Sequence, residues 1–222
     1  MAESSTQKHV TITSHAPVNV EVDTSVLHRK LYLAPIKNPQ RVIDLATGTG
    51  IWAIDFVDEH PQTEVIGCDL SPTQPTLDPP KVKFLVDDIE SEWAYQRNPF
   101  DFVHARNLAG AIRDFGRLIT QCYRKALGWV EFQEWFGYPV SPDDSLNGTA
   151  LQRYYNDVYS AFEKAGHDVQ KFVLPYGVWP KDPHLTKEEV LLLANQARAD
   201  GRKRNIHTMF NFYVVYGQQA EN

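Results

Sequence analysis

The stretch RVIDLATGTGIW, residues 41–52, constrains the fold more strongly than any other part of the 222-residue chain. An apolar run at 41–46 ends in a turn that contains Gly48 and Gly50, and apolar residues at helical spacing follow at 51–60. Glycine adopts the backbone conformations that a tight turn needs, and it lets a ligand approach the main chain. The N-terminus of the following helix would direct its free N–H groups toward the same place. The stretch therefore predicts a strand, a ligand-binding turn and a helix.

The alternation of apolar runs and amphipathic segments continues along the chain. Further strands are predicted at 63–70, 81–88, 99–105, 128–135, 168–177 and 210–217, and further helices at 109–125, 148–164 and 186–201. Strands that alternate with helices favour right-handed crossovers, which build a parallel sheet with helices on both faces. Ligands of such sheets bind beyond the carboxyl ends of the strands, where the strand order reverses. Residues at the strand ends are therefore the first candidates for a functional site.

The length and composition indicate one globular domain with a polar tail. Residues 1–24 are rich in Ser and Thr and are predicted to be disordered, whereas 25–222 are predicted to form a single domain. Within that domain we expect a cofactor half at about 37–135 and a substrate-side half at about 136–218.

Charge and cysteine content exclude several classes of partner. The net charge of −6 disfavours nucleic acids and anionic membranes, which bind basic surfaces. No apolar run approaches the roughly 20 residues of a membrane-spanning helix. Cys68 and Cys122 form neither a metal motif nor a disulfide framework, which predicts no metal and a cytoplasmic location. The basic run at 197–204 leaves a nuclear location open, although it also suits the C-terminal end of a helix.

Acidic residues follow the predicted strands in an order that suggests an adenosine ligand. Asp69 ends the second strand, 19 residues after Gly50, where a carboxylate typically receives the two hydroxyls of a ribose. Asp87 and Asp88 end the third strand, where a carboxylate could accept a hydrogen bond from the exocyclic amine of adenine. Each feature alone is also typical of an ordinary turn or a solvated charge. Their order at successive strand ends favours a ligand.

Two cofactors are compatible with this pattern. The segment GTGIWA at 48–53 matches the dinucleotide fingerprint, with Asp69 as its acid, and so leaves an NAD-dependent oxidoreductase as an alternative. A dehydrogenase usually needs a second catalytic domain, and only about 85 residues follow the fifth strand. Asp44, just before the turn, could hold a cationic amino-acid group, which S-adenosylmethionine has and NAD lacks. The pattern favours a methyl donor.

The segments at 44–75, 82–93, 100–115 and 128–135 resemble the class I S-adenosylmethionine-dependent methyltransferases of filamentous fungi, and most closely the LaeA-like group. The resemblance covers nearly all of 30–218 and implies a Rossmann-like, seven-stranded, mostly parallel sheet whose last strand is antiparallel. It implies that S-adenosylmethionine is bound by Asp44, Ala46, Gly48, Gly50, Asp69, Leu70, Asp88, Ile89 and Arg106. Within this set, Asp69 would hold the ribose, Leu70 would lie beside the adenine, and Asp88 with Ile89 would recognise the adenine.

The chain also departs from the family pattern. Ala46 replaces the first glycine of the usual D-x-G-x-G-x-G. Its methyl group is tolerable there if the residue keeps a negative φ, although it would crowd the cofactor. Helical stretches are shortened near residues 166 and 185 and before Lys30, in segments that cover cofactor and substrate. We therefore expect weak cofactor binding and slow turnover unless a protein partner or a homodimer mate completes the lid. A catalytically weak binding module that works through protein partners is the alternative.

The expected reaction is methylation of a small molecule of fungal secondary metabolism, on oxygen. His104, at the end of the fourth predicted strand, is the candidate general base, although it could instead hydrogen-bond within the sheet. Aromatic residues near the fifth strand, Trp129, Trp135, Phe136 and Tyr138, could line an apolar pocket for the acceptor.

Overall fold

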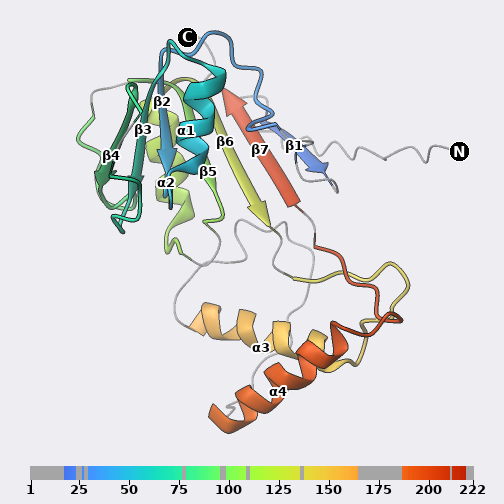
Figure 1. Ribbon diagram of the computed structural model, residues 1–222. Coiled ribbons are helices and arrows are strands. Elements are labelled where there is room, and N and C mark those ends of the chain that lie inside the picture. The colour runs from blue at the N-terminus through green and yellow to red at the C-terminus, as the bar shows by residue number, and fades with distance from the viewer. Residues whose placement is uncertain are drawn as a thin grey trace, which may run out of the picture. The chain divides into compact units, whose positions relative to one another are not determined.

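The computed structural model describes residues 18–23, 27, 30–76, 79–95, 99–108, 111–135, 138–164, 187–210 and 212–218. Its strands are β1 (Val18–Asp23), β2 (Arg41–Leu45), β3 (Glu64–Asp69), β4 (Val82–Val86), β5 (Phe100–Arg106), β6 (Ala126–Trp135) and β7 (Phe212–Gln218) (Figure 1). Its helices are α1 (Ile51–Glu59), α2 (Phe115–Lys125), α3 (Ala150–Lys164) and α4 (Lys187–Asp200). The strands and helices predicted from residue 41 onward are confirmed, except for the strand at 168–177, which lies outside the described residues.

The seven strands form one sheet in the order β1-β7-β6-β5-β2-β3-β4. Strands β2 to β6 are parallel where they pair, and β7 runs opposite to its neighbour β6 (Figure 1). The predicted Rossmann-like sheet with an antiparallel last strand is therefore confirmed. One strand was not expected. Residues 18–23 pair antiparallel with β7, although the sequence predicts disorder up to residue 24.

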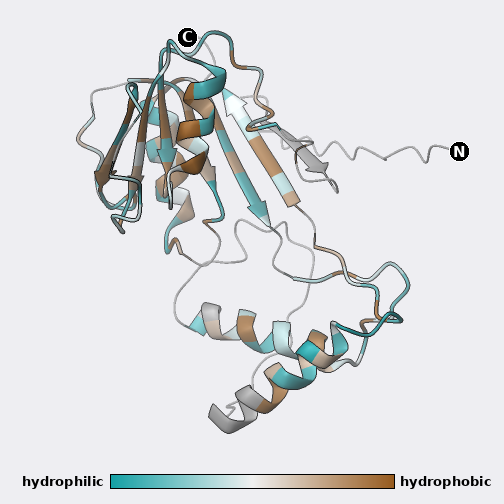
Figure 2. Cartoon of the chain, viewed as in Figure 1, coloured by the Kyte–Doolittle hydropathy of each residue, from teal (hydrophilic) through white to brown (hydrophobic). Residues whose placement is uncertain are grey.

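Helices cover both faces of the sheet. The chain leaves β2 toward β3 through α1 and leaves β5 toward β6 through α2, in opposite directions across the sheet. Right-handed crossovers then place α1 and α2 on opposite faces, as Figure 1 shows. The buried core on the α1 side contains Val42, Phe56 and Phe102, and Leu118 is fully buried on α2. Figure 2 shows that the carboxyl-terminal half of β6, in contrast to this apolar core, is hydrophilic.

The turn after β2 is shaped by packing as well as by backbone conformation. Gly50 precedes α1 with φ 78°, and a Cβ on Gly50 would lie 2.3 Å from the ring of Phe84 on β4. A side chain at position 50 would therefore require the Phe84 ring or the turn itself to move. Gly48 also has a positive φ, 57°, but a Cβ there would meet nothing within 4 Å. Gly48 is needed for its conformation, and its surroundings are open.

The chain divides into two compact units. The sheet unit comprises residues 1–108, 114–134 and 212–222, and the helical unit comprises 109–113 and 135–211. The boundary between the two units lies near residue 135, and β7 belongs to the sheet unit. The assignment of a cofactor half and a substrate-side half stays a prediction. In the helical unit α3 packs against α4. Among the described residues no helix is long and apolar enough to cross a membrane.

Candidate functional site

The order of the strands reverses between β2 and β5, and the carboxyl ends of these two strands hold a buried acid–base pair. Asp44 on β2 and His104 on β5 are register partners, and Asp44 Oδ1 lies 2.7 Å from His104 Nδ1. Asp44 Oδ2 accepts a hydrogen bond of 2.5 Å from the Thr47 hydroxyl in the glycine turn. A switch point of this kind is where open α/β sheets bind ligands.

The same row of side chains continues onto β6. His104 is the register partner of Glu131, so Asp44, His104 and Glu131 lie side by side across three parallel strands. All three are buried. The indole of Trp52 on α1 stacks on the imidazole of His104 with 3.7 Å between ring centroids and 1° between planes. The row is therefore enclosed by α1 and by the sheet itself.

His104 does not have the exposure that a general base toward an acceptor needs. Its ring is fully buried, and Nδ1 is engaged by Asp44. Nε2 is buried and has no hydrogen-bond partner among the described residues. A catalytic base must come within hydrogen-bond distance of the proton that it removes. The structure instead shows His104 hydrogen-bonded to Asp44 within the sheet, which is the other role that the sequence left open for it.

The glycine turn has a left-handed backbone at three positions. Ala46 has φ 51°, Gly48 has φ 57° and Gly50 has φ 78°. Ala46 therefore lacks the negative φ at which its methyl group would be tolerable, because the turn keeps the conformation that glycine would adopt there. An L-residue in this region costs roughly 1–2 kcal/mol. The cost of replacing the first glycine is therefore local backbone strain.

Asp69 holds the glycine turn against the end of β3. Its Oδ2 accepts the N–H of Gly48 at 2.9 Å, and its Oδ1 accepts the N–H of Ser71 at 2.9 Å. The carbonyl of Gly48 accepts hydrogen bonds from Thr73 Oγ1 at 2.9 Å and Gln74 Nε2 at 2.6 Å. The backbone N–H and the carbonyl of Gly48 are thus both held, the first by Asp69 and the second by the segment after β3. Each carboxylate oxygen can accept further bonds, so Asp69 keeps capacity for a ligand hydroxyl.

The residues predicted to contact adenine lie at the ends of β3 and β4. Leu70 is 69% exposed and Val86 is 65% exposed, and Val86 is the register partner of Asp69. Exposed apolar side chains on adjacent strand ends offer a flat surface for a base. Asp88 accepts hydrogen bonds from the Glu90 N–H and the Ser91 hydroxyl, both at 2.9 Å, so it also shapes its own turn.

The other predicted adenine contact, Ile89, is buried. Its carbonyl accepts the indole N–H of Trp93 at 2.9 Å. Because the Ile89 side chain is buried and its carbonyl is engaged, the backbone N–H of Ile89 is the group that could recognise a base. The prediction that Ile89 takes part in cofactor binding stays a prediction.

Sequence reasoning missed a buried polar network on β6. Glu131 accepts the backbone N–H of Leu33 with both oxygens, at 3.1 and 2.9 Å, and that of Ala34 at 2.5 Å. Leu31–Ala34, which we call the strap, is the segment that the buried carboxylate holds. Gln133 Nε2 donates to the Leu31 carbonyl at 2.9 Å and to Glu131 Oε1 at 2.6 Å. Trp52 Nε1 also donates to the Leu31 carbonyl, at 2.9 Å.

Burial and hydrogen bonding act in opposite directions on the ionisation of Glu131. Burial raises the pKa of this carboxyl above its ordinary value, and the Gln133 amide, the His104 charge and the strap N–H groups oppose that rise. Polar residues at alternate positions of a strand usually face solvent, which is why EFQ at 131–133 gave no signal. The partners of Glu131 and Gln133 lie about 100 residues earlier in the chain.

Arg106 ends β5 one pleat beyond His104. Its Nε donates to Gln133 Oε1 at 2.7 Å, and its guanidinium is partly buried. Burial lowers the pKa of Arg106, while the charges of Asp44 and Glu131 raise it. The structure therefore brings Asp44, His104, Arg106, the glycine turn and Asp69 to one end of the sheet.

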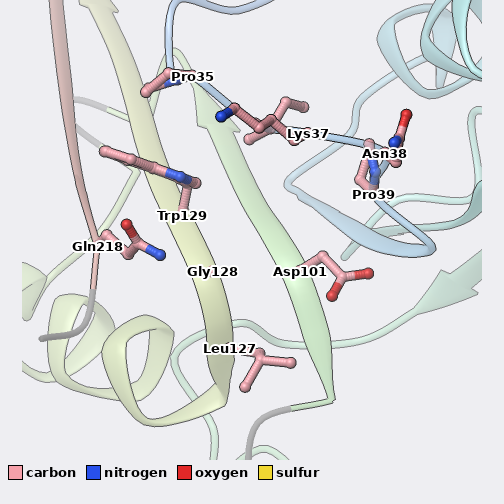
Figure 3. A pocket seen from close by; sticks show the side chains of 10 residues that line it. Pro35, Lys37, Asn38, Pro39, Asp101, Leu127, Gly128, Trp129 and Gln218 are labelled. Carbon is pink, nitrogen blue, oxygen red and sulfur yellow. The ribbon is translucent and has the colours of Figure 1, made fainter. Parts of the chain in front are cut away.

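The aromatic residues predicted to line an acceptor pocket have different surroundings, and Trp135, the last residue of β6, is 40% exposed. Trp129 lies near the start of β6 and lines an open cavity of about 470 Å³ with Lys37, Asp101 and Gln218, at the amino ends of the parallel strands (Figure 3). Tyr138 donates a hydrogen bond of 2.6 Å to Asn156 within the helical unit. Phe136 lies outside the described residues. Among the described residues no group of three potential ligands could hold a metal ion.

Comparison with known proteins decides the family. Residues 20–170 match the model of the family described as "Methyltransferase domain". The chain belongs to this methyltransferase family. It is 33% identical to the methyltransferase pytC of Aspergillus terreus, with 89% of this chain and 78% of pytC covered. It is 31% identical to the secondary metabolism regulator laeA of Aspergillus niger, with 72% of this chain and 49% of laeA covered.

A solved structure supports the fold. The putative methyltransferase from an antibiotic biosynthesis pathway of Anabaena variabilis matches with a TM-score of 0.55 and 11% identity, covering 84% of this chain and 94% of that chain. The protein is thus an S-adenosylmethionine-dependent methyltransferase related to proteins of fungal secondary metabolism. These findings favour that enzyme class over the binding module and over the nicotinamide-dependent oxidoreductase.

The comparison with pytC also bears on the segments that appear shortened in the sequence. The alignment extends over 252 residues, which is more than the 222 residues of this chain. The relative therefore carries segments that this chain lacks.

The residues at the carboxyl ends of the strands suit the cofactor of the family. The described residues that directly follow β2, β3 and β4, at 46–50, 70–76 and 87–95, include no Lys or Arg. Those after β4 include Asp87, Asp88 and Glu90, and the N–H of Asp87 donates to the carbonyl of Asp69. Asp44 adds a buried carboxylate at the switch point. A sulfonium and an ammonium are favoured by this acidic environment, whereas the pyrophosphate of a dinucleotide would be repelled. The donor set thus fits a cationic adenosine cofactor.

Proposed function

We propose that this methyltransferase binds S-adenosylmethionine across the carboxyl ends of β2 to β5 and methylates an oxygen of a small molecule of fungal secondary metabolism. The observation that carries the proposal is the Asp44–His104 pair, which ties the glycine turn to the point where the strand order reverses. When bound, the cofactor supplies a methyl group that its sulfonium has already activated for transfer.

Each residue has a separate part in binding. Asp44 supplies a buried negative charge beneath the ammonium end of the cofactor, whereas Gly48 and Gly50 let the main chain and the N-terminus of α1 approach its carboxylate. Asp69 accepts the ribose hydroxyls with its remaining lone pairs. Leu70 and Val86 pack against the adenine, and Asp88 with Ile89 recognises its edge.

The protein's contribution to the reaction is mainly orientation. Holding two reactants in line can lower the barrier by roughly 7–11 kcal/mol, so no strong base is required of the chain. His104 acts on Asp44 from within the sheet and is a positioning residue. A carboxylic acid is the acceptor best suited to such a site, because it is already ionised at neutral pH. A phenol, whose pKa is about 10, would react more slowly without a base.

The shortened segments bear on turnover more than on cofactor binding. The residues proposed to bind the cofactor are present, whereas pytC carries segments absent from this chain. Exclusion of water strengthens electrostatic interactions in a reacting site. We infer that cofactor binding is weak but measurable, and that turnover is slow unless a protein partner or a second copy of the chain covers the site. A panel of phenols, carboxylic acids and amines, incubated with labelled cofactor, tests the acceptor class.

Asp69 gives the sharpest test of the cofactor position. Asp69→Ala should weaken binding of S-adenosylhomocysteine about 10- to 100-fold in calorimetric titration, by the scale for hydrogen bonds to charged groups. Asp101→Ala is the matched control, because Asp101 also accepts two backbone N–H groups, at 2.7 and 2.9 Å, at the opposite end of the sheet. Equal affinities for the parent and Asp69→Ala would refute the assignment.

Asp88 and its neighbour test the register of the adenine contact. Asp88→Ala should weaken binding more than Asp87→Ala. The reverse order would shift the contact by one residue.

A further inference from the structure

The open cavity at the amino ends of the parallel strands takes no part in the proposed methyl transfer. It has a volume of about 470 Å³, and all the residues that line it belong to the sheet unit (Figure 3). Small-molecule sites usually measure roughly 300–1,000 Å³. One part of the lining is the segment 35–39, which directly follows the strap, and the rest comes from β5, β6 and β7. The cavity is therefore a candidate site at the end of the sheet opposite to Asp69.

A β-bulge shapes the lining of this cavity. The pairing of β5 with β6 shifts register there, and Asp101 on β5 stands opposite both Leu127 and Gly128 on β6. A Cβ on Gly128 would lie 2.2 Å from the carbonyl oxygen of Asp101, so the strands can pass this closely because position 128 is glycine. Leu127 lines the cavity and is 60% exposed. Bulges redirect side chains and are over-represented next to active sites.

Nitrogen atoms gather on one side of the cavity. Figure 3 shows the amine of Lys37, the indole nitrogen of Trp129 and the amide of Gln218 on the same side. Among the described residues Lys37 makes no ion pair, and the indole N–H of Trp129 donates to no acceptor. The half-buried Trp129 ring packs against Tyr216 with 5.8 Å between ring centroids, which fixes the direction of its N–H. An ammonium next to a fixed N–H suits a carboxylate.

Asp101 supplies the opposite chemistry on the other side of the cavity (Figure 3). Its Oδ2 is held by the N–H groups of Gln40 and Arg41, at 2.7 and 2.9 Å. Its Oδ1 accepts no hydrogen bond from the part of the chain that the structure describes, and no ion pair there joins Asp101 to Lys37. A carboxylate oxygen that is held in place and free to accept suits a hydroxyl or an amine.

The lining between these two polar sides is apolar. It consists of Pro35, Ile36, Pro39 and Leu127. The proline rings offer flat surfaces, on which a planar ring packs well.

We propose that this cavity binds a small aromatic carboxylic acid that carries a hydroxyl or amino group at the far end of its ring. The carboxylate accepts hydrogen bonds from Lys37 and Trp129, the ring packs on the apolar lining, and the far group donates to Asp101. The proposal does not rest on the proposed function, because the cavity lies at the opposite end of the sheet from the residues assigned to the cofactor.

The probe is 4-hydroxybenzoate, and benzoate and 4-hydroxybenzamide each lack one of its two polar ends. Ligand-observed NMR titration should show that the parent protein binds either comparison compound about 3- to 10-fold more weakly than 4-hydroxybenzoate. Lys37→Gln and Trp129→Phe should each weaken 4-hydroxybenzoate by a similar factor of about 3–10. The matched controls Lys83→Gln, on the edge strand β4, and Trp135→Phe, at the other end of β6, should leave its binding unchanged.

Asp101→Asn gives the most specific test of the far group. The amide oxygen stays with the N–H groups of Gln40 and Arg41, so an NH2 group replaces Oδ1. The preference for 4-hydroxybenzoate over benzoate should therefore be lost, while benzoate itself binds as before.

Three results would overturn the proposal. The first is no binding of 4-hydroxybenzoate by the parent at about 10 mM, the weak end of measurable affinity. The second is equal binding in Lys37→Gln, Trp129→Phe and their controls. The third is binding that saturating S-adenosylhomocysteine abolishes, since that would place the probe at the carboxyl ends of the strands. Unchanged melting temperatures show that the variants are folded.

Discussion

The chain contains two aspartate–histidine pairs of nearly the same length in very different surroundings. Asp44–His104 measures 2.7 Å, with 4% and 1% of the two side chains exposed, and Asp143–His207 measures 2.6 Å, with 46% and 62% exposed. The buried pair belongs to a row that reaches the glycine turn and the strap. The exposed pair joins two surface segments of the helical unit, where Ser145 also accepts the N–H of His207. The two pairs have the same chemical groups. What distinguishes Asp44–His104 is its burial and its hydrogen bonds to the glycine turn at the carboxyl ends of the strands.

Loss of the buried histidine should have the largest effect. His104→Leu leaves the Asp44 carboxylate buried with Thr47 as its remaining partner, and we expect a loss of about 3–5 kcal/mol in the free energy of unfolding in urea. His207→Leu should change it little, since its partner is solvated. Adding Asp44→Asn to His104→Leu should recover part of the loss. Similar losses for the two histidine variants would show that burial does not distinguish the pairs.

Two carboxylates at opposite ends of the sheet extend the comparison. Glu131 and Asp101 each accept two neighbouring backbone N–H groups, but Glu131 is fully buried and Asp101 is partly exposed. Glu131→Ala should cost about 2–4 kcal/mol of stability, because the strap N–H groups would lose their acceptor without access to water. Asp101→Ala should cost about 1 kcal/mol. A larger loss for Asp101→Ala would contradict the role given to the strap.

The backbone strain at two residues with positive φ, Ala46 and Asn38, gives a smaller expected difference in stability. Ala46→Gly should raise the free energy of unfolding by about 0.5–1 kcal/mol, since glycine relieves the left-handed strain but has a more flexible unfolded chain. Asn38 has φ 46° before β2, and asparagine tolerates this region better. Asn38→Gly should therefore change the stability by less than Ala46→Gly does. Chemical denaturation of the two variants in parallel checks the difference, and a loss in Ala46→Gly would refute the strain.

The smallest effect concerns the pH dependence of the exposed pair. Asp143 raises the pKa of His207, and hydrogen bonds from Ser145, His207 and Ser141 lower the pKa of Asp143. The His207 contribution is fully present below the unfolded pKa of about 6.5 and is lost as pH rises through the folded value. The Asp143 contribution is present above about pH 4 and is lost as pH falls. The difference in the free energy of unfolding between the parent and His207→Leu should thus be larger at pH 5 than at pH 8.5. A difference that does not change with pH would show that the Asp143–His207 pair does not contribute to stability.

Most of the sheet could be predicted because its signals are local. Apolar runs located β2 to β6, and the acids Asp69 and Asp88 mark the ends of β3 and β4. β1 was missed although VNVEVD alternates at the period of a strand, because its polar, Ser/Thr-rich surroundings predicted disorder. That strand forms through pairing with β7, nearly 200 residues later.

The buried network could not be predicted for the same physical reason. Glu131 and Gln133 look like the solvent face of a strand until the strap covers them, and that contact joins residues far apart in the sequence. The conformation of Ala46 could not be predicted from the sequence either, because its φ is set by the turn rather than by the preference of alanine. The sequence singled out His104 as a candidate base by its position at a strand end. Its burial under Trp52, which decides what it can do, depends on the packing of α1.

Calorimetric titration of the parent protein with S-adenosylhomocysteine and, separately, with NADH tests the central claim most directly. The acidic strand ends and the buried Asp44 predict measurable binding of S-adenosylhomocysteine and none of NADH, whose pyrophosphate would meet these carboxylates. Binding of NADH without binding of S-adenosylhomocysteine would contradict the account.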